Sequence, residues 1–156
     1  MIEHLRSEPL FVMRLKVAFD RAQRIGGLAI GGRGIYPVDG GVFEGPRLRG
    51  RVLPDGADWV LWRTDDTMLI DVRTALETDD GALISMQYTG LVYTTTPEAG
   101  AAYRRGEIVP YDQIYVRTTP RFETADPRYL WLNRVIAVAN GSRTVDGPIY
   151  HVFSIQ

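Results

Sequence analysis

Three side chains that could move protons or hold an oxygen atom fall on one predicted pair of strands. Asp71 and Arg73 are two residues apart, so both point to the same face of their strand. Tyr88 lies on the strand predicted to return beside it. If all three point into a hollow interior, they form a polar cluster that can bind and polarise an oxygen-rich ligand. The alternative is a structural Asp–Arg network that holds neighbouring strands together.

Glu44 is a further candidate for a catalytic carboxylate. It stands between Phe43 and the pair Gly45-Pro46, where a carboxylate at the mouth of a barrel could act as a general base. The alternative is a structural acceptor for the backbone N–H groups of a turn, or a partner for an arginine, because carboxylates with altered pKa values also occur in structural networks.

Arg117 is the side chain best suited to bind an anionic group. A guanidinium binds a carboxylate or an enolate through paired hydrogen bonds. Thr119 shares its face of the segment RTTPRFET, subject to a bend at Pro120, and is expected to contact the same ligand. The structural alternative is an ion pair between one of the arginines here and Glu123.

Two tryptophans and an asparagine complete the candidate ligand contacts. Trp131 and Asn133 share a face of a predicted strand, and an asparagine inside a strand needs hydrogen-bond partners that a polar cavity would supply. Trp59 suits either a cavity wall or the ordinary core. The residue before it, Asp58, is interpreted as a cap for backbone groups near a turn.

Several kinds of site are absent from the sequence. There is no cysteine, only 2 histidines, and a single lysine, Lys16, that could form a Schiff base. The glycine-rich segment 26–32 lacks the spacing of a nucleotide loop. Asp79-Asp80 is interpreted as turn chemistry rather than a metal site, and His151 as a packed or exposed residue. The sequence therefore predicts neither a metal nor a cofactor.

Charge and hydropathy limit the classes of partner that the protein is expected to bind. A net charge of −1 creates no strong field toward nucleic acid or an acidic membrane. Neither a signal peptide nor an apolar run of membrane-spanning length is visible, so we expect a cytoplasmic protein. The expected partner is a small-molecule ligand, and exposed strand edges make a homodimer a further expectation.

The elements that must position these residues alternate with period two. Strands are predicted at 9–19, 34–38, 42–43, 48–53, 59–63, 68–78, 82–93, 115–122, 129–139 and 149–155. Turn signals include Asp39-Gly40-Gly41, Pro54-Asp55-Gly56 and Asn140-Gly141. Residues 20–32 are expected to form a turn or loop, and Thr96-Pro97 predicts a short helix over 99–105.

This pattern predicts an all-β protein of 156 residues, with a flexible segment over 1–8 and one domain over 9–156. We expect an antiparallel, roughly eight-stranded, closed or nearly closed barrel with one short helix. Polar residues on both faces of several strands would be costly in a filled sandwich. In a barrel they could line a wet cavity instead.

Five segments have a familiar sequence. They are 40–59, Asp71-Val72-Arg73, Thr78–Ile84, Arg117–Thr124 and Trp131–Arg134. Taken in this order between Pro9 and Ile155, they resemble the bacterial and fungal family DUF3237, also called UPF0311. The resemblance implies an antiparallel β-barrel with a central cavity. It implies no catalytic residue with a stated role.

Three functions are compatible with these observations. The first is an acid–base enzyme without a cofactor, an isomerase, cyclase or lyase. It would act on an oxygenated metabolite, aromatic ones included, through Glu44, Asp71, Tyr88 and Arg117. The second is a non-catalytic, lipocalin-like binding protein. The third is a structural or assembly barrel. A wet cavity where polar groups converge would favour the first two, and a carboxylate of raised pKa beside apolar walls would favour catalysis.

Overall fold

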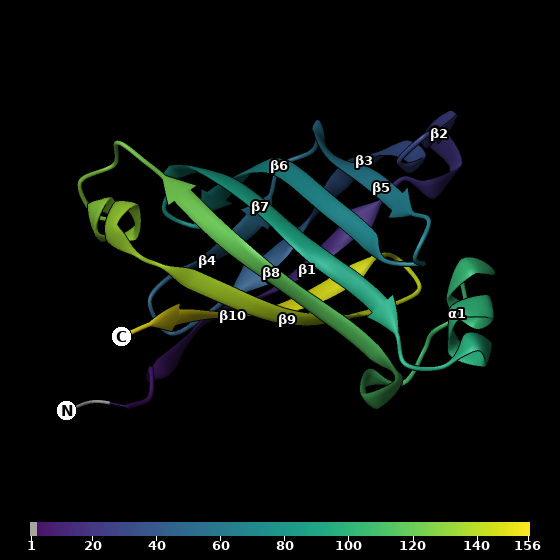
Figure 1. Cartoon of the computed structure of the whole chain (residues 1–156). Helices are drawn as coiled ribbons and strands as arrows, with labels where there is room; N and C mark the ends of the chain where they lie inside the picture. The colour runs from purple at the N-terminus through teal and green to yellow at the C-terminus, as the bar shows by residue number, and fades with distance from the viewer. Residues whose placement is uncertain (1–2) are drawn as a thin grey trace.

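Alternating apolar and polar side chains fold the chain into long antiparallel strands that close on themselves. The structure is a computed structural model that describes residues 3–156, and within them it forms a closed eight-stranded barrel with one short α-helix (Figure 1). The strands are β1 (Ser7–Val17), β2 (Gln23–Leu28), β3 (Gly31–Glu44), β4 (Arg49–Val52), β5 (Gly56–Arg63), β6 (Met68–Thr78), β7 (Leu83–Thr94), β8 (Ile114–Glu123), β9 (Ala137–Arg143) and β10 (Pro148–Ile155). The helix α1 (Pro97–Arg104) and the 3₁₀ turns η1 (Phe19–Arg21), η2 (Tyr111–Gln113) and η3 (Leu130–Arg134) connect them.

The barrel closes because β1 has a partner on each side. It pairs with β10 along one edge and with β3 along the other. From β10 the order runs through β9, β8, β7 and β6 to β5, which pairs with β3. Strand β4 also pairs with both β3 and β6, so it continues the position of β5 in the ring, whereas β2 pairs with β3. Every pair is antiparallel, so the predicted barrel is confirmed.

Side chains of the two faces separate as the pleat requires. Along β6, Met68, Ile70, Val72 and Leu76 are buried inside, whereas Arg73 is exposed outside. The predicted helix is confirmed as α1, where the Thr96 hydroxyl accepts a hydrogen bond from Ala99 N–H at 3.1 Å. None of the described helices is both long enough and apolar enough to cross a membrane.

One end of the barrel is filled. Phe11 packs against Phe43 and Phe122, with ring centroids 5.4 and 5.8 Å apart. The turn η3, which Figure 1 shows at the end opposite α1, adds the buried side chains of Tyr129 and Leu132. This end therefore has a continuous apolar core.

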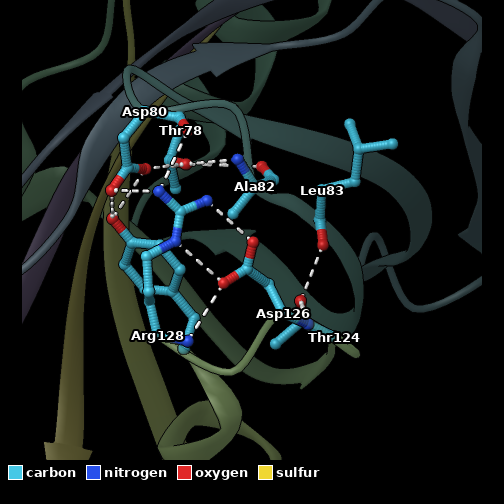
Figure 2. A network of polar contacts seen from close by, with 8 residues as sticks. Thr78, Asp80, Ala82, Leu83, Thr124, Asp126 and Arg128 are labelled. Atoms are coloured by element: carbon cyan, nitrogen blue, oxygen red, sulfur yellow. Dashed lines mark hydrogen bonds and ion pairs between the residues drawn. The ribbon is translucent and has the colours of Figure 1, made fainter.

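A polar network holds the loop before η3 on the β6–β7 hairpin (Figure 2). Asp80 accepts hydrogen bonds from the hydroxyls of Thr78 at 2.5 Å and Tyr129 at 2.9 Å. Arg128 bridges Asp80 at 3.1 Å and Asp126 at 2.8 Å. The Thr78 hydroxyl is the main reason why the pKa of Asp80 is lowered. Asp80 thus acts as a turn and loop anchor.

Glycines in the first third of the chain form strand where turns were predicted. The loop expected over 20–32 is wrong for most of its length, because residues 23–28 form β2 and residues 31–32 begin β3. The turn expected at Asp39-Gly40-Gly41 is also wrong, because these residues lie inside the continuous strand β3. Gly41 adopts φ 152°, and a Cβ there would lie 2.2 Å from the carbonyl oxygen of Arg14. The glycine is needed for close approach of β1, a long-range contact. Of the expected flexible segment 1–8, residues 1–2 lie outside the described residues, and Ser7 and Glu8 already belong to β1.

Two predictions near the C-terminus are also wrong. The segment 129–139 is not one strand, because η3 precedes β9. Asn140 and Gly141 lie inside β9, and the turn is made by Thr144 and Gly147, whose backbones bond at 2.7 Å. A Cβ at Gly141 would lie 2.9 Å from the ring of Tyr150. Gly141 therefore makes room for an inward-facing tyrosine on the next strand.

Candidate functional site

The end of the barrel beside α1 is hollow. A cavity of about 520 Å³ opens there, within the size range of small-molecule sites. Its apolar wall includes Val60, Ile70, Val92 and Val116. The polar residues that line it include Asp58, Tyr36, Tyr103, Tyr150 and Arg143.

Asp58 is the carboxylate of this cavity, and β5 positions it. It shares the inner face of that strand with Val60 and Trp62. The β5–β6 ladder pairs Asp58 with Val72 and resumes at Leu61 and Leu69. Between these two stretches of pairing, Asp58 Oδ1 accepts a hydrogen bond from the backbone N–H of Asp71 at 3.0 Å. The carboxylate is held at the wall by a backbone donor, as expected of a capping aspartate.

Burial makes Asp58 a weaker acid than an exposed aspartate. It raises the pKa of Asp58 from 3.8 to about 7. The hydrogen bond from Asp71 N–H opposes the rise, and the negative charge of the Asp71 carboxylate adds to it. A carboxyl group that titrates near neutral pH can both take and return a proton under physiological conditions.

Tyr150 lines the floor of the cavity, and a second buried tyrosine packs against it. Tyr88 stands in register with Val72, and therefore in the same row of the barrel as Asp58. Its ring packs edge-on against Tyr150, with centroids 5.3 Å apart. The Tyr88 hydroxyl is fully buried, and no group within residues 3–156 donates a hydrogen bond to it or accepts one from it. Burial raises the pKa of both phenols above the ordinary range, so both remain protonated donors.

The mouth is lined by aromatic rings from four separate elements. Tyr103 of α1 packs on Trp62 of β5, with centroids 6.1 Å apart. Phe19 of η1 packs on Tyr36 of β3 at 6.2 Å. Burial raises the pKa of Tyr103, against the opposing effect of the positive charge of Arg143. The short helix and η1 thus supply the rings that narrow the entrance.

These groups together suit proton transfer on an oxygenated, unsaturated molecule. A carboxylate that is half ionised near pH 7 stands among phenol donors and aromatic walls. Within residues 3–156, no three acidic or histidine side chains gather closely enough to ligate a metal ion.

Of the residues predicted from sequence as catalytic, Tyr88 lies inside the barrel, packed against Tyr150. Asp71 points outward from β6 and reaches the cavity only through its N–H and its charge on Asp58. Arg73 is exposed on the same outer face. Glu44 is exposed where β3 ends, at the filled end of the barrel. The predicted inward cluster of Asp71, Arg73 and Tyr88 is therefore not formed.

The remaining predicted residues also lie outside the cavity. Arg117, Thr119 and Trp59 line a groove on the outer surface, where the Arg117 guanidinium stands over the Tyr115 ring at 4.6 Å. The ring of Trp131, on η3 at the filled end, is covered by the guanidinium of Arg47. Asn133 bonds the backbone of Thr124 at 2.8 and 2.9 Å.

Sequence reasoning missed Asp58, Tyr36, Tyr103, Tyr150 and Arg143 as site residues. In the segment ADWVLWR, residues 58, 60 and 62 share one face and 59 and 61 the other. Both faces are rich in apolar side chains, so the alternation does not say which one is inside. An aspartate in line with Val60 and Trp62 was the available signal.

Comparison with known proteins adds a family to this geometry. A family model described as "Protein of unknown function (DUF3237)" matches residues 6–155. A UPF0311 protein of Rhodopseudomonas palustris is 32% identical over 148 residues, covering 95% of this chain and 96% of its own. A UPF0311 protein of Bradyrhizobium diazoefficiens is 35% identical over 147 residues, covering 90% and 95%.

Solved structures share the same barrel. A conserved protein of Rhodopseudomonas palustris superposes with a TM-score of 0.93 at 31% identity, covering 99% of this chain and 100% of its own. A β-barrel-like protein of Acinetobacter baumannii does so with 0.86 at 34%, covering 100% and 99%. A structure described as an enzyme from Penicillium herquei has a TM-score of 0.71 at 21% identity, covering 100% and 98%, and shares the fold. With the family model spanning nearly all of its length, the chain belongs to the DUF3237 family, whose curated relatives carry the name UPF0311.

Proposed function

We propose that this protein is an acid–base enzyme for a small, oxygenated, unsaturated molecule, with Asp58 as the general base. One observation carries the proposal: a carboxylate whose pKa is raised by burial to about 7 faces a cavity between apolar and aromatic walls. A base is most effective when its pKa lies near the working pH.

The proposed chemistry needs only the side chains of the cavity. Asp58 would remove a proton from a hydroxyl group, or from a carbon next to a carbonyl, and the electron pair left behind would spread onto an oxygen of the substrate. The cavity phenols of Tyr36, Tyr103 and Tyr150 can donate hydrogen bonds to that oxygen. Asp58 then returns its proton to another atom. The net result is an isomerisation, a ring closure by addition, or an elimination where a leaving group departs.

The substrate class follows from the walls. Aromatic rings on several sides of the mouth favour a planar molecule, which can stack or pack edge-on against them. The family relation to UPF0311 proteins names no substrate. The Penicillium herquei structure, described as an enzyme, supports the view that this barrel can serve catalysis.

Deuterium incorporation tests the proposal without a known substrate. The protein is incubated in D₂O with a library of hydroxylated aromatic compounds and enolisable ketones, and mass spectrometry follows each compound. We expect wild-type protein to label or convert at least one compound. Asp58→Asn should slow this by about 100-fold or more, since general base catalysis contributes at least that factor.

A matched control separates the base from general damage. Arg117→Ala alters the outer groove, and it should leave the rate unchanged. Equal rates for wild type and Asp58→Asn would refute the role of Asp58. Compounds that bind in native mass spectrometry but gain no deuterium would indicate a binding protein without turnover.

A further inference from the structure

Arg143 carries a positive charge at the cavity mouth without a matching anion. It ends β9 and is half-buried. Its guanidinium carbon lies 4.9 Å from the centroid of the Phe19 ring and 5.4 Å from that of Tyr103. Its Nε is fully buried and has no hydrogen-bond partner, and its contact from Nη1 to the Tyr103 carbonyl oxygen is long, at 3.5 Å. An arginine cannot shed its proton, so this charge persists.

The other arginines at the mouth differ in this respect. Arg105 is paired with Glu107 at 2.6 Å, and Arg104 with Asp66 at 3.3 Å. Arg24 is exposed and therefore solvated by water. Arg143 takes part in none of the ion pairs formed among residues 3–156. Removing part of its water without a carboxylate partner is costly, and a bound anion would offset that cost.

We propose that Arg143 is the anchor for a carboxylate on the ligand, so that the cavity selects small planar acids, aryl or α,β-unsaturated carboxylates, over their neutral analogues. This inference rests on the proposed function insofar as it names the substrate class of the same cavity. The Nη groups would bind the carboxylate, because Nε is out of reach of any ligand.

Charge and shape in the cavity define the class more closely. Arg143 offers one uncompensated positive charge, which matches the single negative charge of a carboxylate. Asp58, also in the cavity, would repel a second negative charge once it is ionised. The carboxylate therefore lies at the mouth. The unsaturated body of the ligand extends inward between Trp62 and Tyr36, toward Asp58 and the floor.

Binding of paired probes tests this anchor. Benzoate, trans-cinnamate and 2-naphthoate are compared with benzamide, cinnamamide and 2-naphthamide by isothermal titration calorimetry at low salt. For at least one pair, we expect wild type to bind the acid 10-fold or more tightly than the amide. Arg143→Met should abolish the difference while Arg143→Lys retains part of it, because arginine offers paired donors and lysine a single charged group.

Arg105→Met is the matched control, since it removes an arginine of the same mouth that is already paired with Glu107. It should keep the preference for acids. If no acid binds more tightly than its amide, or if folded Arg143→Met protein keeps the preference, the proposal is refuted. Circular dichroism and the melting temperature establish that each variant is folded.

The result is separable from the test of the proposed function. Asp58→Asn lacks the base but retains Arg143, so it should still prefer acids. Preference for acids without deuterium labelling would leave the anchor standing and refute the enzyme. Labelling of neutral compounds alone, with no preference for acids, would refute the anchor and leave the enzyme standing.

Discussion

Replacing Asp58 by asparagine should stabilise this protein at alkaline pH. The change keeps the size of the side chain, and the amide oxygen can still accept the Asp71 N–H that now bonds Oδ1 at 3.0 Å. What it removes is the charge. Burial raises the pKa of Asp58 in the folded state, so the folded protein holds this proton more tightly than the unfolded chain does. The stability linked to it is complete below the unfolded pKa and is lost as the pH rises through the folded value.

The structure sets the size of the effect. One unit of pKa difference corresponds to about 1.4 kcal/mol. A rise from 3.8 to about 7 therefore makes ionised Asp58 cost roughly 4 kcal/mol of unfolding free energy. Water in the cavity reduces this cost, and we expect about 2–4 kcal/mol. The cost is near zero below about pH 4 and complete above about pH 7.

Urea unfolding of wild type and Asp58→Asn, followed by tryptophan fluorescence, measures this difference. At about pH 8 the midpoint of the variant should be higher by about 1–2 M, and the gap should close as the pH approaches 4. Contributions of other titrating groups cancel in the comparison because both proteins share them. Two curves that run parallel between pH 4 and 8 would show that Asp58 titrates normally and would refute the reasoning.

Two further substitutions test the surroundings of the site and the opposite end of the barrel. Asp71→Asn should lower the pKa of Asp58, because the charge of Asp71 raises that pKa. The variant keeps the backbone N–H that bonds Asp58. An unchanged midpoint of Asp58 in a carboxyl NMR titration would contradict this. Asp80→Ala should lower the melting temperature by roughly 2–4 °C, because Tyr129 and Arg128 lose their shared acceptor. Asp79→Ala changes the exposed residue next to Asp80, and it should lower the melting temperature less. An equal loss in the two variants would argue against the network.

Much of the fold follows from local patterns. The alternation over Met68–Thr78, the turn after it and the returning strand predict the β6–β7 hairpin, and Thr96-Pro97 predicts α1. These features depend on neighbours in sequence, so they can be read from one chain. The glycines failed as turn signals for the opposite reason. Gly41 is required by the close approach of Arg14, which is distant in sequence, and Gly141 by the ring of Tyr150 on the neighbouring strand.

The alternation of side chains along a strand places Asp71 and Arg73 on one face of β6, and Asp58, Val60 and Trp62 on one face of β5. It does not determine which face is inside. That is decided when β1 pairs with both β3 and β10 and the sheet closes. The raised pKa of Asp58 likewise exists only in the closed barrel, because burial by distant strands is its main cause. Strand parity is a local property, whereas enclosure, and with it the chemistry of the cavity, is created by the tertiary structure.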